Sequence, residues 1–202
     1  MDAVIDSFRR DHRKINALLR VLECECDLFR RAERSDYELL SEIIDYFRSS
    51  LDQYYYLKED LMFNLTRVRT TQCDSIIDNI ADERAVAASS LQVLGDTLRD
   101  ILNEQRVLRQ TFNDAAHAFI QHERRQIEIE ERQLFPAVLS ILAPADWADL
   151  RTKLSNKKEP LRSHGLEERL RESTQSTTQK AETQERVQRS RDGDKAPVNL
   201  RP

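Results

Sequence analysis

Apolar residues recur along most of the chain alternately three and four positions apart, the spacing of a helix face packed in a bundle. Four such stripes occur, running from Phe8 to Phe29, Tyr37 to Leu65, Cys73 to Ile101 and Leu108 to Leu134. Turn-forming residues are almost absent between them, since Gly95 and Pro136 are the only glycine and proline before residue 144. The pattern predicts an all-α fold, an up-down-up-down four-helix bundle.

Several residues mark the expected helix ends. Ser35 can cap the second helix, with Glu38 three residues later completing a capping box. Pro136 should kink or end the fourth helix, because proline removes a backbone donor and clashes with the preceding turn. The segment 144–146 resembles a turn and N-cap. A short helix carrying Trp147 should follow it and close one end of the bundle.

From about residue 155 onward the composition changes, because aromatic residues disappear and Ser, Thr, Gln and charged residues dominate. Too few apolar groups remain there to offset the entropy of ordering the chain. We therefore expect a four-helix domain over 1–154 and a polar, disordered C-terminal tail over 155–202. The tail is interpreted as a solubilising segment, with a contact arm for an unidentified protein partner as the alternative.

Charge and cysteine usage narrow the function classes. The formal net charge is −4, and no basic face stands out, so we expect neither nucleic-acid nor membrane binding. The N-terminus lacks an apolar signal region, and no apolar run is long enough to span a bilayer, so we expect a cytoplasmic protein. Cys24, Cys26 and Cys73 are too few for a secreted disulfide scaffold and are interpreted as small core residues.

Every stripe is interrupted by polar residues at one level. These are His12 in the first stripe, Tyr55 and Glu59 in the second, Arg84 in the third, and Gln126 and Glu130 in the fourth. In an up-down-up-down bundle, the positions of these residues relative to their helix ends place them at a similar depth. Because buried ionisable groups are costly unless paired or metal-bound, the four interruptions call for one cause. That cause is either a metal site or a metal-free network of charges.

Spacing within the stripes bears on the metal alternative. Tyr55 and Glu59, and likewise Gln126 and Glu130, are four residues apart, so each pair lies on one helix face and can reach one ion. This geometry suits a di-iron carboxylate bundle. However, the partners of the glutamates are tyrosine and glutamine, whereas imidazole is the usual nitrogen ligand of iron.

Four segments together resemble the hemerythrin HHE cation-binding domain family over about residues 4–155. They are DHRKI around His12, YYLKEDLMFNL from Tyr55, DERAVAASSL from Asp82 and EERQLFPAVLSIL from Glu130, followed by DW at Asp146. The resemblance implies a hemerythrin-like four-helix bundle with a non-haem di-iron centre. It also implies that His12 is the first-helix ligand and that Glu59 and Glu130 are the carboxylate ligands.

The chain departs from the family pattern at most of the other ligand positions. Tyr55 and Tyr56 stand where the resemblance implies histidine in the second helix, Arg84 where it implies one in the third, and Gln126 where it implies one in the fourth. His122 lies one turn from Gln126, either as a substitute ligand or as part of a buried polar network.

Arg84 is the most informative departure, because a guanidinium is always charged, matches carboxylates and cannot ligate a cation. We hypothesise that Arg84 replaces the metal charge by pairing with Glu59, Glu130 or both, while His12, Tyr55 and Gln126 complete the hydrogen bonds. The competing hypothesis keeps one non-haem iron, held by His12, Glu59, Glu130 and the Tyr55 phenolate.

These hypotheses lead to two predictions of function. The favoured one is a hemerythrin-like protein that has lost di-iron binding, has no cofactor and acts as a non-catalytic structural or interaction module. The alternative is an iron- or oxygen-binding or sensing protein with an atypical His/Tyr/Glu site and a residual iron-dependent redox activity. Neighbouring polar residues, namely Lys58, Asp60, Glu128 and Glu131, are expected on solvated helix faces, and Tyr55 alone of the tyrosine triplet is expected to point inward.

Overall fold

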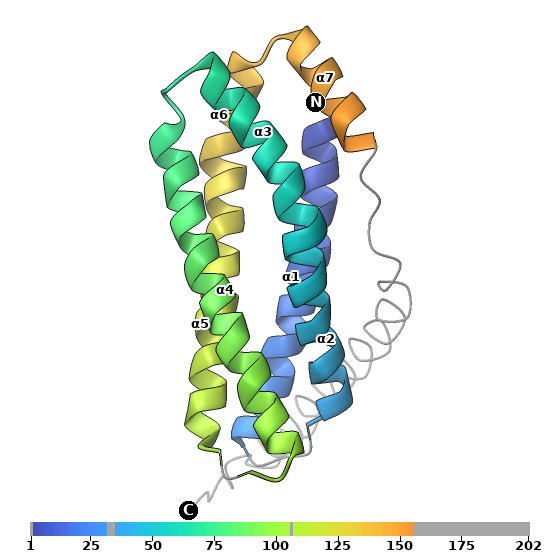
Figure 1. Ribbon diagram of the computed structural model, residues 1–202, viewed down its shortest axis with the longest axis vertical. Helices are drawn as coiled ribbons and strands as arrows, with labels where there is room; N and C mark the ends of the chain where they lie inside the picture. Colours follow the sequence, from blue (N-terminus) through green and yellow to red (C-terminus); the bar gives the residue numbers. More distant parts are fainter. Residues whose placement is uncertain (1, 32–34, 106, 156–202) are drawn as a thin grey trace, which may run out of the picture. The chain divides into compact units, whose positions relative to one another are not determined.

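The computed structural model describes residues 2–31, 35–105 and 107–155, which form helices connected by short turns (Figure 1). The first rod is α1 (Ala3–Arg30) and the third is α4 (Asp74–Leu102). The second and fourth rods are each interrupted by one π-helical turn: α2 (Tyr37–Ser50), η1 (Leu51–Tyr55) and α3 (Tyr56–Arg69), then α5 (Arg109–Ile129), η2 (Glu130–Leu134) and α6 (Phe135–Ile141). A last helix, α7 (Pro144–Ser155), follows. No strand occurs in these ranges, and the predicted all-α bundle is confirmed.

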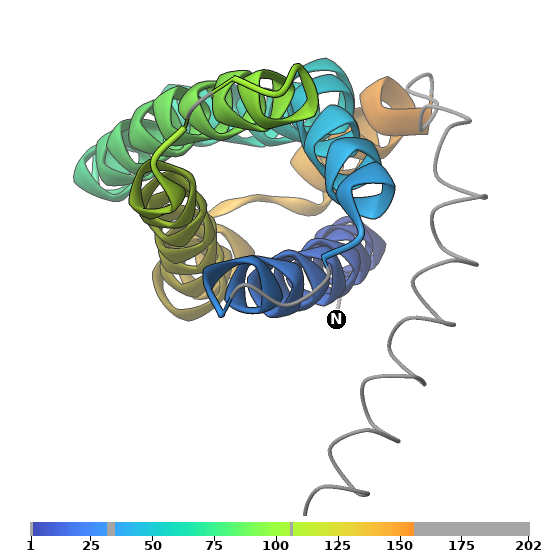
Figure 2. The ribbon, with the colours of Figure 1, turned by 90° about the horizontal axis from the view of Figure 1, so that it is seen from below.

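The four rods surround a common interior, as the view along the bundle shows (Figure 2). Helix α4 packs against α5 and α2, and α1 packs against α5 and α2, so each rod has two neighbours. Neighbouring rods are connected by short turns and run in opposite directions, as predicted (Figure 1). Residues at equivalent depths on all four rods therefore face one another.

One half of the bundle has a core of mainly apolar side chains, which we call the apolar half and define by four phenylalanines. Phe29 meets Phe112 with ring centroids 4.9 Å apart, and Phe47 meets Phe119 at 5.0 Å, both edge to face. Phe47, Phe112 and Phe119 are completely buried. Such edge-to-face pairs are favourable beyond the area that they bury.

Gly95 lies in the middle of α4 where this helix passes α2. A Cβ atom at this position would stand 3.1 Å from Arg48 Nη1 and 3.3 Å from Ile44 Cγ2. Glycine is unfavourable inside a helix. Here it leaves room for the Arg48 side chain between the two helices.

The start of α2 corrects one prediction. Asp36, not Ser35, is the N-cap residue, because its carboxylate accepts a hydrogen bond of 2.9 Å from the Leu39 amide. The Ser35 hydroxyl instead donates to the Glu25 carbonyl at 3.1 Å. Both residue types cap helices well, so the sequence alone does not separate neighbours.

Pro136 does not end the fourth rod, because α6 continues to Ile141. The π-helical turn η2 precedes it, and the Phe135 amide donates to the Glu130 carbonyl five residues back. A wider turn relieves the contact that a proline ring makes with the preceding turn of a regular α-helix. The proline is therefore accommodated by a local widening.

Helix α7 begins at Pro144 and packs against α3 and α1, with Trp147 buried, so it covers one end of the bundle as predicted (Figure 1). Asp146 lies in the first turn, where it accepts the Ala143 amide at 3.0 Å and pairs with Arg69 at 2.6 Å. The predicted tail falls outside the described residues from 156 onward. Among the described helices, none is long and apolar enough to cross a membrane.

Candidate functional site

Both π-helical turns lie where the polar residues of the stripes meet. The turn η1 ends at Tyr55, and η2 begins at Glu130. A π turn inserts an extra residue into a helix and is frequent at functional sites. The six residues that the stripes singled out, His12, Tyr55, Glu59, Arg84, Gln126 and Glu130, are joined here by hydrogen bonds, and we call them the polar layer.

Gln126 connects the carboxylates of Glu59 and Glu130, the two inner carboxylates, both of which are completely buried. Its side-chain Nε2 donates to Glu130 Oε1 at 2.9 Å and lies 3.3 Å from each carboxylate oxygen of Glu59. Its Oε1 atom is buried and has no hydrogen-bond partner among the described residues. The amide thus joins α3 to the fourth rod and keeps one acceptor unused.

His12 and Tyr55 occupy the other side of Glu130. His12 Nε2 lies 2.5 Å from the Tyr55 hydroxyl and 3.0 Å from Glu130 Oε2, and the hydroxyl donates to the same Oε2 at 3.0 Å. The imidazole stacks on Phe135 with ring centroids 5.5 Å apart. Its Nδ1 lies 2.7 Å from Glu131 Oε1, so His12 links the interior to a partly exposed carboxylate.

Arg84 reaches Glu59 but not Glu130. Its Nη2 donates to Glu59 Oε2, and its Nη1 donates to Asp60 Oδ1 at 2.9 Å. The guanidinium carbon lies 4.1 Å above the centre of the Tyr56 ring, a cation–π contact. The hypothesis allowed Arg84 to pair with Glu59, with Glu130 or with both, and the structure contains the pair with Glu59. The Arg84 side chain is 19% exposed, so it enters the layer from the edge.

One buried pair was missed by the sequence analysis. The Tyr56 hydroxyl donates to Glu123 Oε1 at 3.0 Å, and Glu123 is 1% exposed. The expectation that Tyr55 alone points inward is wrong, because the π turn before Tyr56 changes which positions share a face. Glu123 could have been found from its spacing, since it precedes Gln126 by three residues and Glu130 by seven.

Two of the four residues expected on solvated faces are wrongly placed. Lys58 is 2% exposed and pairs with Asp11 at 2.5 Å. Glu131 is only partly exposed and binds both His12 and Arg9. These residues form an outer shell of ion pairs around the layer.

The side chains of the other two residues are exposed as expected. The Asp60 side chain is 48% exposed and binds Arg84 at the edge of the layer. Glu128 is exposed and pairs with Arg132 at 2.8 Å.

His122 is not part of the buried network, so its predicted place is wrong. Its side chain is 33% exposed, and Nδ1 lies 2.5 Å from Glu83 Oε2. Glu123 and Gln126 lie on the buried face of α5. His122 lies beside that face, at its boundary with solvent.

The ionisable groups of the polar layer differ in whether their surroundings favour the charged or the neutral form. Burial opposes the ionised forms of both His12 and Glu130, but their mutual hydrogen bond and attraction outweigh it. The pKa of His12 is therefore raised and that of Glu130 lowered, so the two form an ion pair. Burial and the nearby Glu130 charge raise the pKa of Glu59 well above its usual value, although Arg84 opposes this shift.

The remaining buried groups favour their neutral forms. Burial and the Glu130 and Glu59 carboxylates raise the pKa of Tyr55 well above its usual value. Burial raises the pKa of Glu123 to about 7, although the hydrogen bond from Tyr56 opposes this shift. A Tyr55 phenolate would thus require a strong local positive charge.

The donor set decides which metal site these residues fit. His12, Glu59 and Glu130 each offer one ligand atom, and these atoms lie within 4.8 Å of one another. They supply a single imidazole, and Arg84 already binds Glu59. Two irons need more ligands than these three residues offer, and the guanidinium places a fixed positive charge on one of the two carboxylates.

Comparison with known proteins gives one finding. The family model described as the hemerythrin HHE cation-binding domain matches residues 3–138. Searches of curated proteins and of solved structures return no match.

Proposed function

The chain belongs to the hemerythrin HHE cation-binding domain family, and we propose that it is a member that has lost the di-iron centre. In this proposal the protein is a non-catalytic helical module, and its polar layer holds the four rods in register without a metal. The proposal includes a cytoplasmic location and a protein partner, contacted through the tail 155–202. It includes neither an enzymatic activity nor binding to nucleic acid or membranes.

One observation carries the proposal, namely that every oxygen of the two inner carboxylates has a donor from the protein. Glu59 accepts from Arg84 and Gln126. Glu130 accepts from Gln126 on one oxygen and from Tyr55 and His12 on the other. Buried carboxylates are stable when paired and hydrogen-bonded in this way.

A polar layer of this kind can specify how helices align. Each hydrogen bond that joins two rods requires one particular height on both, whereas apolar contacts tolerate small shifts. Gln126 and Glu59 join the fourth rod to the second, and Arg84 joins the third to the second. His12 joins the first rod to both Tyr55 and Glu130. This connection of all four rods is the structural role that we propose.

The grouping of His12, Glu59 and Glu130 supports a second candidate, a single non-haem iron with the Tyr55 hydroxyl beside it. A ferric ion bound there would supply redox chemistry and the positive charge that stabilises a phenolate. His12, Tyr55, Glu59 and Glu130 would hold it.

Elemental analysis of the full chain purified from iron-supplemented cells, read beside its visible spectrum, separates the two candidates. The metal-free proposal predicts iron far below one equivalent and no visible absorption band. Near-stoichiometric iron with colour would overturn it. A Tyr55→Phe variant is the matched control, because it keeps the ring but removes the phenolate, so an iron form should lose its colour and hold less iron.

A further inference from the structure

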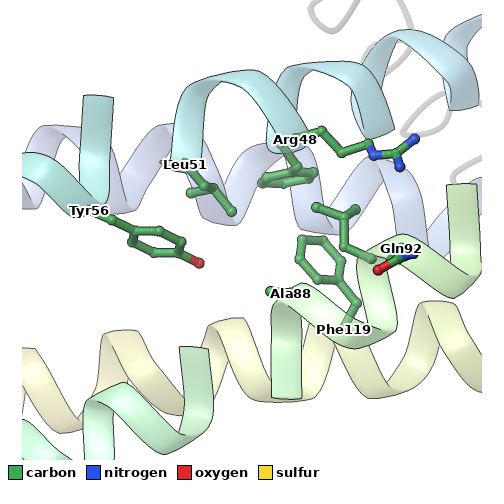
Figure 3. A pocket seen from close by; sticks show the side chains of 8 residues that line it. Arg48, Leu51, Tyr56, Ala88, Gln92 and Phe119 are labelled. Carbon is green, nitrogen blue, oxygen red and sulfur yellow. The ribbon is translucent and has the colours of Figure 1, made fainter. Parts of the chain in front are cut away.

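A pocket of about 260 Å³ lies outside the polar layer, between α2, α4 and α5 (Figure 3). Its middle is apolar and is lined by Phe47, Leu51, Ala88, Leu91 and Phe119. Drug-sized ligands occupy pockets of roughly 300 to 1,000 Å³, so this one suits a smaller molecule. The apolar lining favours a hydrocarbon group.

The two ends of the pocket are polar and differ in chemistry. Figure 3 shows Tyr56 at one end and Arg48 and Gln92 at the other, with Leu51, Ala88 and Phe119 between them. The Tyr56 hydroxyl already donates its hydrogen to Glu123 and can only accept a further hydrogen bond. The donors available to a ligand are therefore at the Arg48 end.

Arg48 and Gln92 are exposed residues, so this end of the pocket opens to solvent. Several other arginines of the bundle pair with carboxylates, for example Arg67, Arg84, Arg99 and Arg124. Within the described ranges, no carboxylate lies at ion-pair distance from Arg48. Its Nη1 atom lies over Gly95, where any Cβ would meet it at 3.1 Å. The guanidinium thus lies beside the pocket, exposed to solvent and without a carboxylate partner among the described residues.

We propose that this pocket binds a small amphipathic anion, namely a carboxylate on a short hydrocarbon chain. The carboxylate pairs with the Arg48 guanidinium and accepts from the Gln92 amide, while the chain lies along the apolar middle toward Tyr56. Guanidinium and carboxylate match in shape and charge. The site uses none of the polar-layer carboxylates, so it does not depend on whether that layer holds a metal.

Tyr56 gives the pocket a connection to the polar layer. Its ring lines the pocket and also supports the Arg84 guanidinium, which binds Glu59. A bound chain would contact this ring and restrict its motion. Ligand binding is therefore expected to raise the unfolding temperature of the bundle.

Octanoate is the probe for the test. Octan-1-ol is the control that lacks the charge, and acetate is the control that lacks the hydrocarbon chain. Calorimetric titration of the full chain should show octanoate binding more tightly than octan-1-ol, and no binding of acetate. The Gln92 side-chain amide signal in a two-dimensional NMR spectrum should shift with octanoate. Absence of octanoate binding, or equal binding of octanoate and octan-1-ol, would overturn the proposal.

Three variants locate the site. Arg48→Gln should weaken octanoate about tenfold while leaving octan-1-ol unchanged, because it removes a charged donor. Ala88→Phe, at an exposed position, should fill the pocket and abolish binding of both. Arg99→Gln, which removes a surface pair on α4, should change neither. Octanoate binding that survives both of the first two variants would place the site elsewhere and refute the assignment.

Discussion

The fourth rod shows two ways of filling the interior of one bundle. In its first half, Phe112 and Phe119 are completely buried against phenylalanines of α1 and α2. In its second half, Glu123, Gln126 and Glu130 are at most 1% exposed and are held by hydrogen bonds. The first half is regular α-helix, whereas the second runs into a π-helical turn.

The two kinds of core have different requirements. Apolar contacts are non-directional, so a residue in the apolar half depends on volume and shape. Each residue in the polar layer depends on a named partner, and loss of one partner leaves another group buried without compensation. Substitutions in the two halves should therefore differ in their dependence on pH and on second substitutions.

The largest expected effect is in the apolar half. Phe112→Ala should lower the free energy of unfolding by about 3 to 5 kcal/mol, because it leaves a cavity in a packed core. The loss, measured by urea denaturation, should be the same at pH 5 and pH 8, since the ring is completely buried and packs on Phe29, and the nearby Arg109 is charged at both pH values. Phe112→Leu is the control and should cost less. A loss that varied strongly with pH would contradict the proposed difference between the apolar half and the polar layer.

Glu123 should produce the strongest pH dependence. Its folded pKa of about 7 exceeds the usual 4.5, so the folded state binds the proton more tightly than the unfolded state. Its contribution is full below about pH 4.5 and is lost as the pH rises through 7, at most about 3 kcal/mol.

Glu123→Gln keeps an acceptor for Tyr56 and cannot ionise. It should be more stable than the parent protein at pH 8 and should lose this advantage toward pH 4.5. Thermal unfolding across that range measures the difference, and parallel pH curves for the two proteins would contradict the shift.

Arg84→Ala should cost about 2 kcal/mol at pH 8. This is below the roughly 3 to 5 kcal/mol of a fully buried pair, because Arg84 is 19% exposed and Glu59 can take up a proton. Adding Glu59→Gln should recover part of the loss, as a double-mutant cycle would show. Arg99→Ala is the surface control and should stay within about 0.5 kcal/mol of the parent. Equal effects of Arg84→Ala and Arg99→Ala would refute the network.

The smallest effect is expected at Gly95. Replacement by alanine should gain up to about 1 kcal/mol in helix propensity. The new Cβ would meet Arg48 Nη1 at 3.1 Å and Ile44 Cγ2 at 3.3 Å, which offsets the gain. The net change in unfolding free energy should stay below about 1 kcal/mol. A much larger loss would mean that Arg48 cannot move aside.

Much of the bundle could be predicted from the sequence, because its stripes have one simple period. The same period placed His12, Tyr55, Glu59, Gln126 and Glu130 at one depth, where the structure joins them by hydrogen bonds. The period could not give the two π turns, which depend on tertiary packing and on local relief before Pro136.

The errors in the candidate site follow from those turns and from side-chain reach. Tyr56 was expected on the outer face, yet it follows η1 and points inward. Lys58 and Glu131 were expected in solvent because their charges suggested it, but long side chains reach partners across the interface. Asp36 and Ser35 are both good capping residues, so only the backbone geometry separates them.

The dependence of thermal unfolding on iron tests most directly whether the polar layer is complete without a metal. Thermal unfolding of the full chain is measured by calorimetry after chelator treatment and again with one equivalent of ferric ion, kept soluble as its nitrilotriacetate complex. Because a ligand that binds the folded state raises its stability, a metal site would raise the unfolding temperature on addition of iron. The metal-free network predicts identical unfolding temperatures in the two samples. An iron-dependent increase that is lost in a Glu130→Gln variant would contradict it.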